Sequence, residues 1–205
     1  MSDERDEQPE LSETELVPPP PAGYAPPEPF VYPMWGLQGA ALLVLVLMGG
    51  SLLLFLGWWH GELSLTLGLG ELLLVLLTVA VVIVVHELVH GAVYRLLGYE
   101  VQFGVAWQMG AAYAAVFGQF QQRGHNFASA VAPLVVLTAV LFPLLLVPNS
   151  VLNLIGFTAL LFNTSGAVGD LYLMWRLWRL PPGSLLYDVN PETMLIYRRL
   201  AREKA

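Results

Sequence analysis

The stretch from Leu69 to Gly91 reads LGELLLVLLTVAVVIVVHELVHG, a long aliphatic run that ends in a polar motif. Glu71 is the only charged residue in it before His86. A helix of about 20 apolar residues is long enough to cross the roughly 30 Å hydrocarbon core of a membrane. We therefore predict a transmembrane helix from about Leu69 to Leu97, with ionisable side chains near its end.

Three other apolar stretches satisfy the same length requirement, at about residues 36–59, 127–147 and 151–175. The chain of 205 residues is 56% hydrophobic and 12% charged, whereas soluble domains carry about 25% charged residues. We predict an all-α integral membrane protein with a four-helix membrane core over residues 34–180. The composition excludes an ordinary soluble enzyme. The net charge of −7, without a basic patch, predicts no nucleic-acid partner.

Two segments flank this core. Residues 1–33 hold eight acidic residues and nine prolines, a composition that predicts a disordered tail. Residues 181–205 leave the membrane, and Asn190-Pro191-Glu192 predicts the start of a short basic helix that rests on the membrane surface. Lys and Arg are concentrated after the second and fourth spans. The positive-inside rule therefore predicts a multi-pass protein of the cell membrane with both termini in the cytoplasm.

The region between the second and third spans, residues 101–120, follows a different pattern. Apolar residues at 101, 103, 105 and 107 alternate with small or polar ones, and a similar alternation resumes from Tyr113 to Phe117. This is the period of a half-buried strand, and residues 108–110 offer a turn. The pattern predicts a small membrane-associated β-hairpin, whose edges must be covered by protein or water.

The motif that carries chemistry is His86-Glu87-Leu88-Val89-His90. Positions i and i+4 of a helix lie on one face, so His86 and His90 can present two imidazole nitrogens to one metal ion. Glu87 lies beside that face and is placed to act as a general base towards water. Because no cysteine is present, thiolate zinc sites are excluded. We assign His86 and His90 as zinc ligands and Glu87 as the catalytic residue. The alternative is a pair of interfacial histidines that reach the headgroups.

A catalytic zinc ion generally has three protein ligands, and Asp170 is the best candidate for the third. It is the one acidic residue of the fourth span, and an intramembrane carboxylate needs a partner. Gly166 and Gly169 predict that this span approaches the second one closely. The alternatives for Asp170 are an ion pair with Arg176 or a hydrogen bond between helices.

Two further residues are accessory candidates. His125, at the start of the third span, is an alternative ligand, a donor to the transition state or a histidine satisfied at the interface. Asn163 lies on the same helix face as Asp170 and is either a donor to an oxyanion or part of a packing hydrogen bond. His60 falls on the other side of the membrane, so we do not expect it at the site.

The long apolar helix ending in His-Glu-Leu-x-His-Gly and the Ser165–Asp170 segment in the last span resemble the DUF3267 family of zincin-type membrane peptidases. The layout is also similar to the site-2 protease superfamily of intramembrane metalloproteases. The resemblance implies that His86, His90 and Asp170 are zinc ligands, that Glu87 is the general base, and that the site lies inside the membrane near the cytoplasm. Site-2 proteases typically carry Asn-Pro and Leu-Asp-Gly in the last motif, whereas here Thr164 follows Asn163 and Leu171 follows Asp170, which leaves the substrate class open.

The sequence thus predicts a zinc-dependent intramembrane or juxtamembrane peptidase, a hydrolase with Zn²⁺ as cofactor. Its partners would be membrane lipids and a membrane-protein or peptide substrate, and the hairpin would hold an unwound substrate strand by edge pairing. Two alternatives stay open. One is a non-proteolytic metal-binding membrane scaffold, and the other is a hydrolase that acts on a non-peptide membrane substrate.

Overall fold

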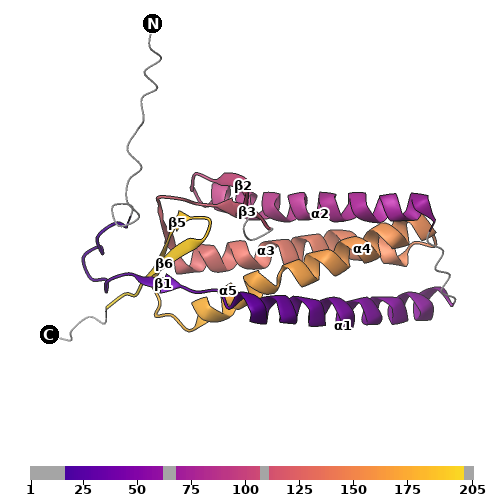
Figure 1. Cartoon of the computed structure of the whole chain (residues 1–205), viewed down its shortest axis with the longest axis horizontal. Coiled ribbons are helices and arrows are strands. Elements are labelled where there is room, and N and C mark those ends of the chain that lie inside the picture. The colour runs from indigo at the N-terminus through magenta and orange to yellow at the C-terminus, as the bar shows by residue number, and fades with distance from the viewer. Residues whose placement is uncertain (1–16, 62–67, 107–110, 201–205) are drawn as a thin grey trace, which may run out of the picture.

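The computed structural model describes residues 17–61, 68–106 and 111–200. It contains the four predicted helical spans, each long and apolar enough to cross a membrane (Figure 1). In chain order they are α1 (Met34–His60), α2 (Leu69–Leu96), α3 (Arg123–Leu141) continued by the 3-10 helix η1 (Phe142–Leu146), and α4 (Ser150–Gly166) continued by α5 (Val168–Trp178). The predicted number and positions of the long helices are therefore confirmed.

The outward faces of these helices are apolar. Leu54 of α1, Leu77 of α2 and Val140 of α3 are 78%, 61% and 64% exposed. Such exposure of aliphatic side chains is typical of helices that face lipid. Inside the bundle, α4 packs against α1, α2 and α3. Its side chains complete two apolar clusters, one around Leu160 with α1 and η1, the other around Ala159 with α2 and α3.

Two of the spans are irregular. Pro133 lies inside α3, where a proline removes one backbone hydrogen bond of the helix. The fourth span is interrupted at Ala167, whose φ of −70° and ψ of 1° separate α4 from α5. Both irregularities lie next to the polar residues described below.

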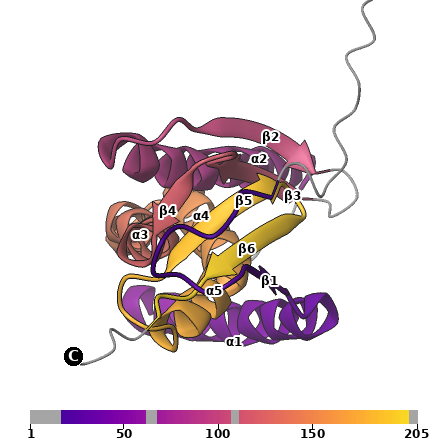
Figure 2. The same cartoon turned by 90° about the vertical axis from the view of Figure 1, so that its left-hand side faces the viewer.

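A four-stranded antiparallel sheet lies across one end of the bundle (Figure 2). Its strands are β1 (Glu28–Phe30), β6 (Thr193–Tyr197), β5 (Leu185–Asn190) and β4 (Phe120–Gln122), in that spatial order. Phe30, Leu186 and Ile196 of the sheet pack against Leu173 and Leu177 of α5. The sheet therefore shares a core with the end of the fourth span.

This sheet corrects the prediction for the C-terminal segment, which is wrong in placing a basic helix after Asn190. The Asn190 side chain accepts bonds from the amides of Glu192 and Thr193, at 2.9 and 2.8 Å, and so closes a turn between β5 and β6. The next residues, Thr-Met-Leu-Ile-Tyr, include β-branched and aromatic side chains that favour a strand. Asn190, which the sequence predicted at the start of a helix, therefore forms an Asx turn of a hairpin instead.

The prediction of a disordered tail over residues 1–33 is also wrong for its second half. Residues 28–30 form β1, in register with residues 194–196 of β6. Phe30 is only 5% exposed, and its aromatic contacts with Tyr32 and Tyr172 anchor the segment. The apolar side chains among the prolines therefore pack into the core, and this packing orders the segment around β1. Residues 1–16 lie outside the described part.

The predicted hairpin between the second and third spans is confirmed. Strand β2 (Gln102–Ala106) pairs antiparallel with β3 (Ala111–Ala115), in a sheet of their own, while the predicted turn lies outside the described residues. The ring of Phe103 occupies the space beside Gly91, where a Cβ would overlap it. Gly91 thus lets the hairpin lie directly on the last turns of α2.

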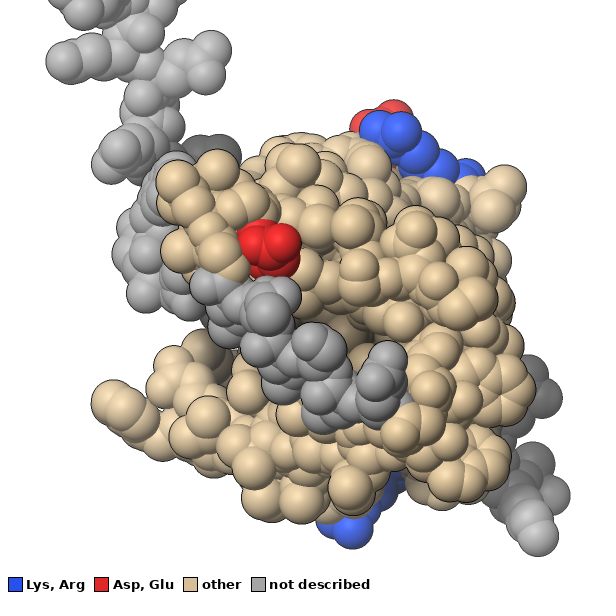
Figure 3. Space-filling model, turned by 90° about the vertical axis from the view of Figure 1, so that its right-hand side faces the viewer, with Lys and Arg blue, Asp and Glu red and all other residues tan. Residues whose placement is uncertain are grey.

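The two ends of the bundle differ in charge. Arg95, Arg123 and Arg176 lie at the end that carries the sheet, because they stand in the last turn of α2, at the start of α3 and in the last turn of α5. Figure 3 shows the opposite end, where uncharged residues dominate the visible surface. This asymmetry agrees with the sense of the predicted orientation, with the sheet end in the cytoplasm, which stays a prediction.

Candidate metal centre

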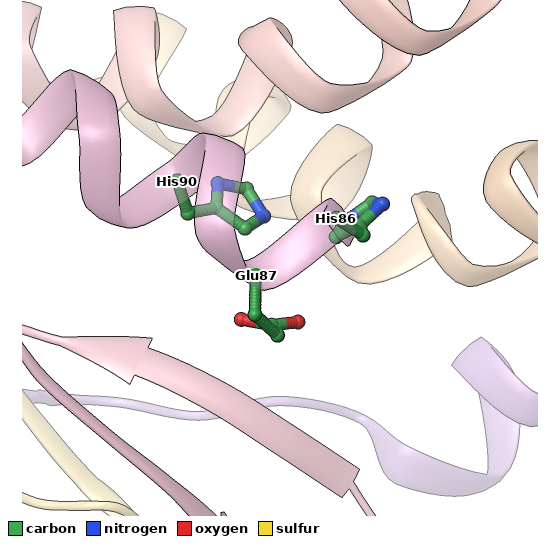
Figure 4. A group of neighbouring side chains, drawn as sticks. All are labelled: His86, Glu87 and His90. Carbon is green, nitrogen blue, oxygen red and sulfur yellow. The ribbon is translucent and has the colours of Figure 1, made fainter. Parts of the chain in front are cut away.

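The HExxH motif lies on α2, and its two histidines share one face of the helix (Figure 4). The imidazole rings of His86 and His90 are 4.9 Å apart between centroids, and their side chains are only 11% and 10% exposed. Together with Glu87, these residues form a group that could hold a metal ion, since one ligand atom from each lies within 4.8 Å of the others.

Asp170 faces the same two histidines from the first turn of α5. Its Oδ2 atom lies 3.1 Å from Nε2 of His86 and 3.4 Å from Nε2 of His90. The two nearby glycines do not create this approach, contrary to the prediction, because a Cβ added at Gly166 or Gly169 would meet no atom within 4 Å. The break in the fourth span before α5 places the carboxylate instead.

The other nitrogen of each histidine has a partner of its own. Nδ1 of His86 lies 2.9 Å from Oδ1 of Asn163, whose amide nitrogen is directed to the carbonyl of Pro133 at 3.4 Å. Nδ1 of His90 lies 2.9 Å from the backbone carbonyl of Ser129. Residue 133 has no N–H, so it cannot form the helical bond to the carbonyl four residues earlier, which is that of Ser129. The proline thus frees the oxygen that His90 uses.

These contacts determine what the Nε2 atoms can do. Both Nδ1 partners are oxygen acceptors, so each Nδ1 carries the hydrogen and each neutral ring leaves a lone pair on Nε2. Two lone pairs and a carboxylate oxygen then converge, which is unfavourable unless a proton or a metal ion lies among them. Ligands at 2.0–2.1 Å from a tetrahedral zinc ion lie about 3.3 Å from one another, close to the two distances observed. The residues present therefore fit a zinc ion.

Glu87 projects from α2 towards the strands of the hairpin (Figure 4). Its carboxylate faces the backbone amide of Ala114 in β3. In an antiparallel pair, the amide and carbonyl of one residue point to the same side of the strand. Because the Ala114 amide faces Glu87, it belongs to the edge of β3 that is not paired with β2. Glu87 therefore stands between the two histidines and an edge of β3 that pairs with no other described strand.

The remaining predicted residues lie elsewhere or have a different partner. His125 is bound through Nδ1 to the Tyr99 hydroxyl at 2.8 Å and is not brought to the histidine–aspartate group. His60 lies at the other end of the bundle, as predicted, next to the carbonyl of Leu145. Asn163 is at the site, but its described contacts are with His86 and Pro133, so it orients a ligand.

Sequence reasoning missed the carbonyl of Ser129 as part of the site. The signal that could have found it is a proline inside a membrane span, because every such proline frees the carbonyl four residues earlier. A released carbonyl in an apolar environment needs a donor. His90, on a helix that packs against α3, is that donor.

One family matches residues 79–185, more than half of the chain: DUF3267, described as "Putative zincin peptidase". The chain belongs to this family. The matched region contains the whole HExxH motif and Asp170, and the family implies zinc as the metal. No curated protein and no solved structure matches the chain. The expected similarity to site-2 proteases stays a prediction.

Proposed function

We propose that the protein is a zinc-dependent peptidase that works within or beside the membrane. His86, His90 and Asp170 would hold the zinc ion, and Glu87 would be the catalytic base. One observation carries the proposal: three acceptor atoms converge beside a glutamate that is not needed as a ligand. A catalytic zinc site keeps one position open, and three protein ligands leave it so.

The zinc ion, when bound, would supply a Lewis acid that polarises the scissile carbonyl and acidifies water. The chain's own groups perform the remaining work. Glu87 removes a proton from the attacking water and delivers it to the leaving amine. Asn163 and the Ser129 carbonyl hold the Nδ1 hydrogens of the two histidines, which directs both Nε2 lone pairs to the same point.

The hairpin is proposed to position the substrate. The free edge of β3 runs past Glu87, because the Ala114 amide faces that carboxylate. An extended peptide can add to a free strand edge through its backbone groups. A helical substrate segment must first unwind, since its carbonyls are already hydrogen bonded. Pairing with β3 would hold the unwound peptide next to the base.

The experiment compares Glu87→Gln with the wild-type protein and with Glu100→Gln, a matched control at an exposed position between α2 and β2. Metal analysis of the purified proteins should give about one zinc per chain in all three. Cross-linking in membranes, followed by mass spectrometry, should show uncleaved substrate accumulating on Glu87→Gln alone. Unchanged cleavage products in that variant would contradict the peptidase proposal and favour a non-proteolytic metal-binding scaffold.

The ligand assignment is tested separately. Asp170→Asn and His86→Ala should lower the zinc content strongly, whereas His125→Ala should leave it near the wild-type value, because His125 is bonded to Tyr99 instead. Zinc loss in His125→Ala with retention in Asp170→Asn would move the third ligand to His125. Hydrolysis of a peptide amide and hydrolysis of another membrane-borne amide require the same groups at this site. The identity of the trapped molecule therefore decides between a peptide and a non-peptide substrate.

A further inference from the structure

A second polar feature lies where the fourth span ends, apart from the proposed metal centre. It is a cavity of about 410 Å³ lined by Tyr172, Trp175, Arg176, Arg179, Leu180 and Arg198. Five of these residues belong to α5 or to the two positions that follow it, and Arg198 follows β6. Three guanidinium groups therefore line one concave surface at the sheet end of the bundle.

The charge of this cavity is only partly balanced. Arg198 pairs with Glu28, through Nη2 at 2.9 Å and Nε at 3.1 Å from the same carboxylate oxygen. Arg176 donates to the Tyr172 hydroxyl at 2.9 Å, and Arg179 lies over the Trp175 ring at 3.8 Å. In the part of the chain that the structure describes, neither Arg176 nor Arg179 has a carboxylate within 4.0 Å. Among the described residues, the charges of Arg176 and Arg179 are therefore not balanced by a carboxylate.

The position of the cavity matches the depth of lipid headgroups. Trp175 and Trp178 are 48% and 76% exposed, and Leu171, one turn earlier in α5, is 41% exposed. Exposed indole rings at the end of an apolar helix are typical of the membrane–water interface. A ligand in the cavity would thus have phosphate-binding arginines on one side and apolar surface for acyl chains on the other.

We propose that this cavity binds the phosphate of an anionic phospholipid. Arginine forms a planar fork that donates two bonds to a phosphate, and it keeps its charge when partly buried. The ring contacts of Arg176 and Arg179 hold both side chains in place before the ligand arrives. This inference does not depend on the proposed peptidase activity, because it uses none of the residues of the metal centre.

The test uses the full-length protein in a neutral detergent and counts bound lipid by native mass spectrometry. Phosphatidylglycerol and phosphatidylcholine with identical chains are titrated separately. An arginine near an anionic lipid surface contributes about a fivefold change in affinity. We therefore expect phosphatidylglycerol to bind at least fivefold more tightly, and Arg179→Gln to lose about fivefold of its affinity. The double variant Arg176→Gln/Arg179→Gln should bind both lipids equally.

Arg95→Gln is the matched control, because it removes the same charge at the same end of the bundle but outside the cavity. An unchanged affinity in this variant, with the zinc content of all variants preserved, supports the proposal. An equal loss of phosphatidylglycerol affinity in Arg95→Gln and Arg179→Gln would mean that the lipid responds only to general surface charge. This result would overturn the proposal. Equal binding of the two lipids by the wild type would overturn it as well. Complete displacement of the lipid by inorganic phosphate at millimolar concentration would show that free phosphate is the ligand instead.

Discussion

Replacing Pro133 by alanine should weaken zinc binding while leaving the fold as stable as before or more so. The substitution restores an N–H group to the middle of α3. This group would bond to the Ser129 carbonyl, the acceptor that now holds the Nδ1 hydrogen of His90 at 2.9 Å. The helix and the histidine would then compete for one oxygen. The two consequences have opposite signs, which separates this effect from ordinary damage to the fold.

The two magnitudes follow from the surroundings of Pro133. Removing a proline from the interior of a helix stabilises the helix by about 3 kcal/mol. The loss of two buried carbons on mutation to alanine destabilises the fold by about 1.6 kcal/mol. The metal-free protein should therefore gain roughly 1 kcal/mol. Loss of a partner that orients a metal-bound histidine costs 10- to 100-fold in affinity. A carbonyl has two lone pairs and can be shared, so we expect the lower end, about tenfold.

Zinc affinity is measured by competition with a chromophoric chelator in detergent, and stability by thermal unfolding of the metal-free protein. Pro143→Ala is the matched control, because Pro143 lies in η1, in the same span but away from the histidines. The control should change zinc affinity less than twofold. Wild-type zinc affinity in Pro133→Ala, or equal losses of affinity and stability, would refute the idea that the freed carbonyl orients His90.

Three other predictions follow from single contacts. Asn163→Leu removes the acceptor from Nδ1 of His86 and should lower zinc affinity by about 10- to 100-fold; a change below twofold by the same titration would contradict the orienting role. Burial raises the pKa of Asp188 to about 6, so the folded protein loses up to about 3 kcal/mol of stability as pH rises from about 4 to 7. Asp188→Asn should therefore melt higher than the wild type at pH 7.5 and converge with it near pH 4, and a constant difference would rule this out. Gly91→Ala should displace the Phe103 ring, at a cost of about 1–3 kcal/mol, and speed hydrogen exchange in residues 102–115; Phe103→Ala in the same chain should reverse that increase.

The long helices could be predicted because each is encoded locally. A run of about 20 apolar residues is sufficient for a membrane span whatever its neighbours are, and this is why the bounds of α1 and α2 agree with the structure within a few residues. The hairpin of β2 and β3 is local in the same sense, since its two strands are adjacent in sequence and alternate in polarity.

The four-stranded sheet could not be predicted in this way. Its strands are three to six residues long, and β1 pairs with β6 near the far end of the chain. Nothing in the Glu28–Phe30 segment itself indicates a strand among prolines. It becomes one because β6 offers a free edge and because the core beneath it accepts Phe30. Pairing partners that are distant in sequence decide this part of the fold.

The candidate site likewise has residues that could be predicted from local sequence and contacts that depend on tertiary packing. His86, Glu87 and His90 follow from helical spacing, and Asp170 follows from the cost of a carboxylate within a membrane span. The partners of the Nδ1 atoms depend on how three helices pack, so Asn163 could be selected as relevant but not assigned to His86. The Ser129 carbonyl is a backbone group, and residue types alone do not reveal it.

The two irregular spans are what allow a polar site inside this apolar bundle. In a regular helix every carbonyl is already bonded within the helix, so it has little capacity to orient a histidine on a neighbouring helix. Pro133 in α3 releases one such carbonyl for His90. The break at Ala167 begins a new helix, whose N-terminal dipole favours a negative charge in the first turn, where Asp170 lies. The break in α3 thus provides a hydrogen-bond acceptor, and the break before α5 provides a favourable position for a carboxylate. A straight helix would offer neither. Substitutions that make either span regular should therefore reduce zinc binding without reducing stability.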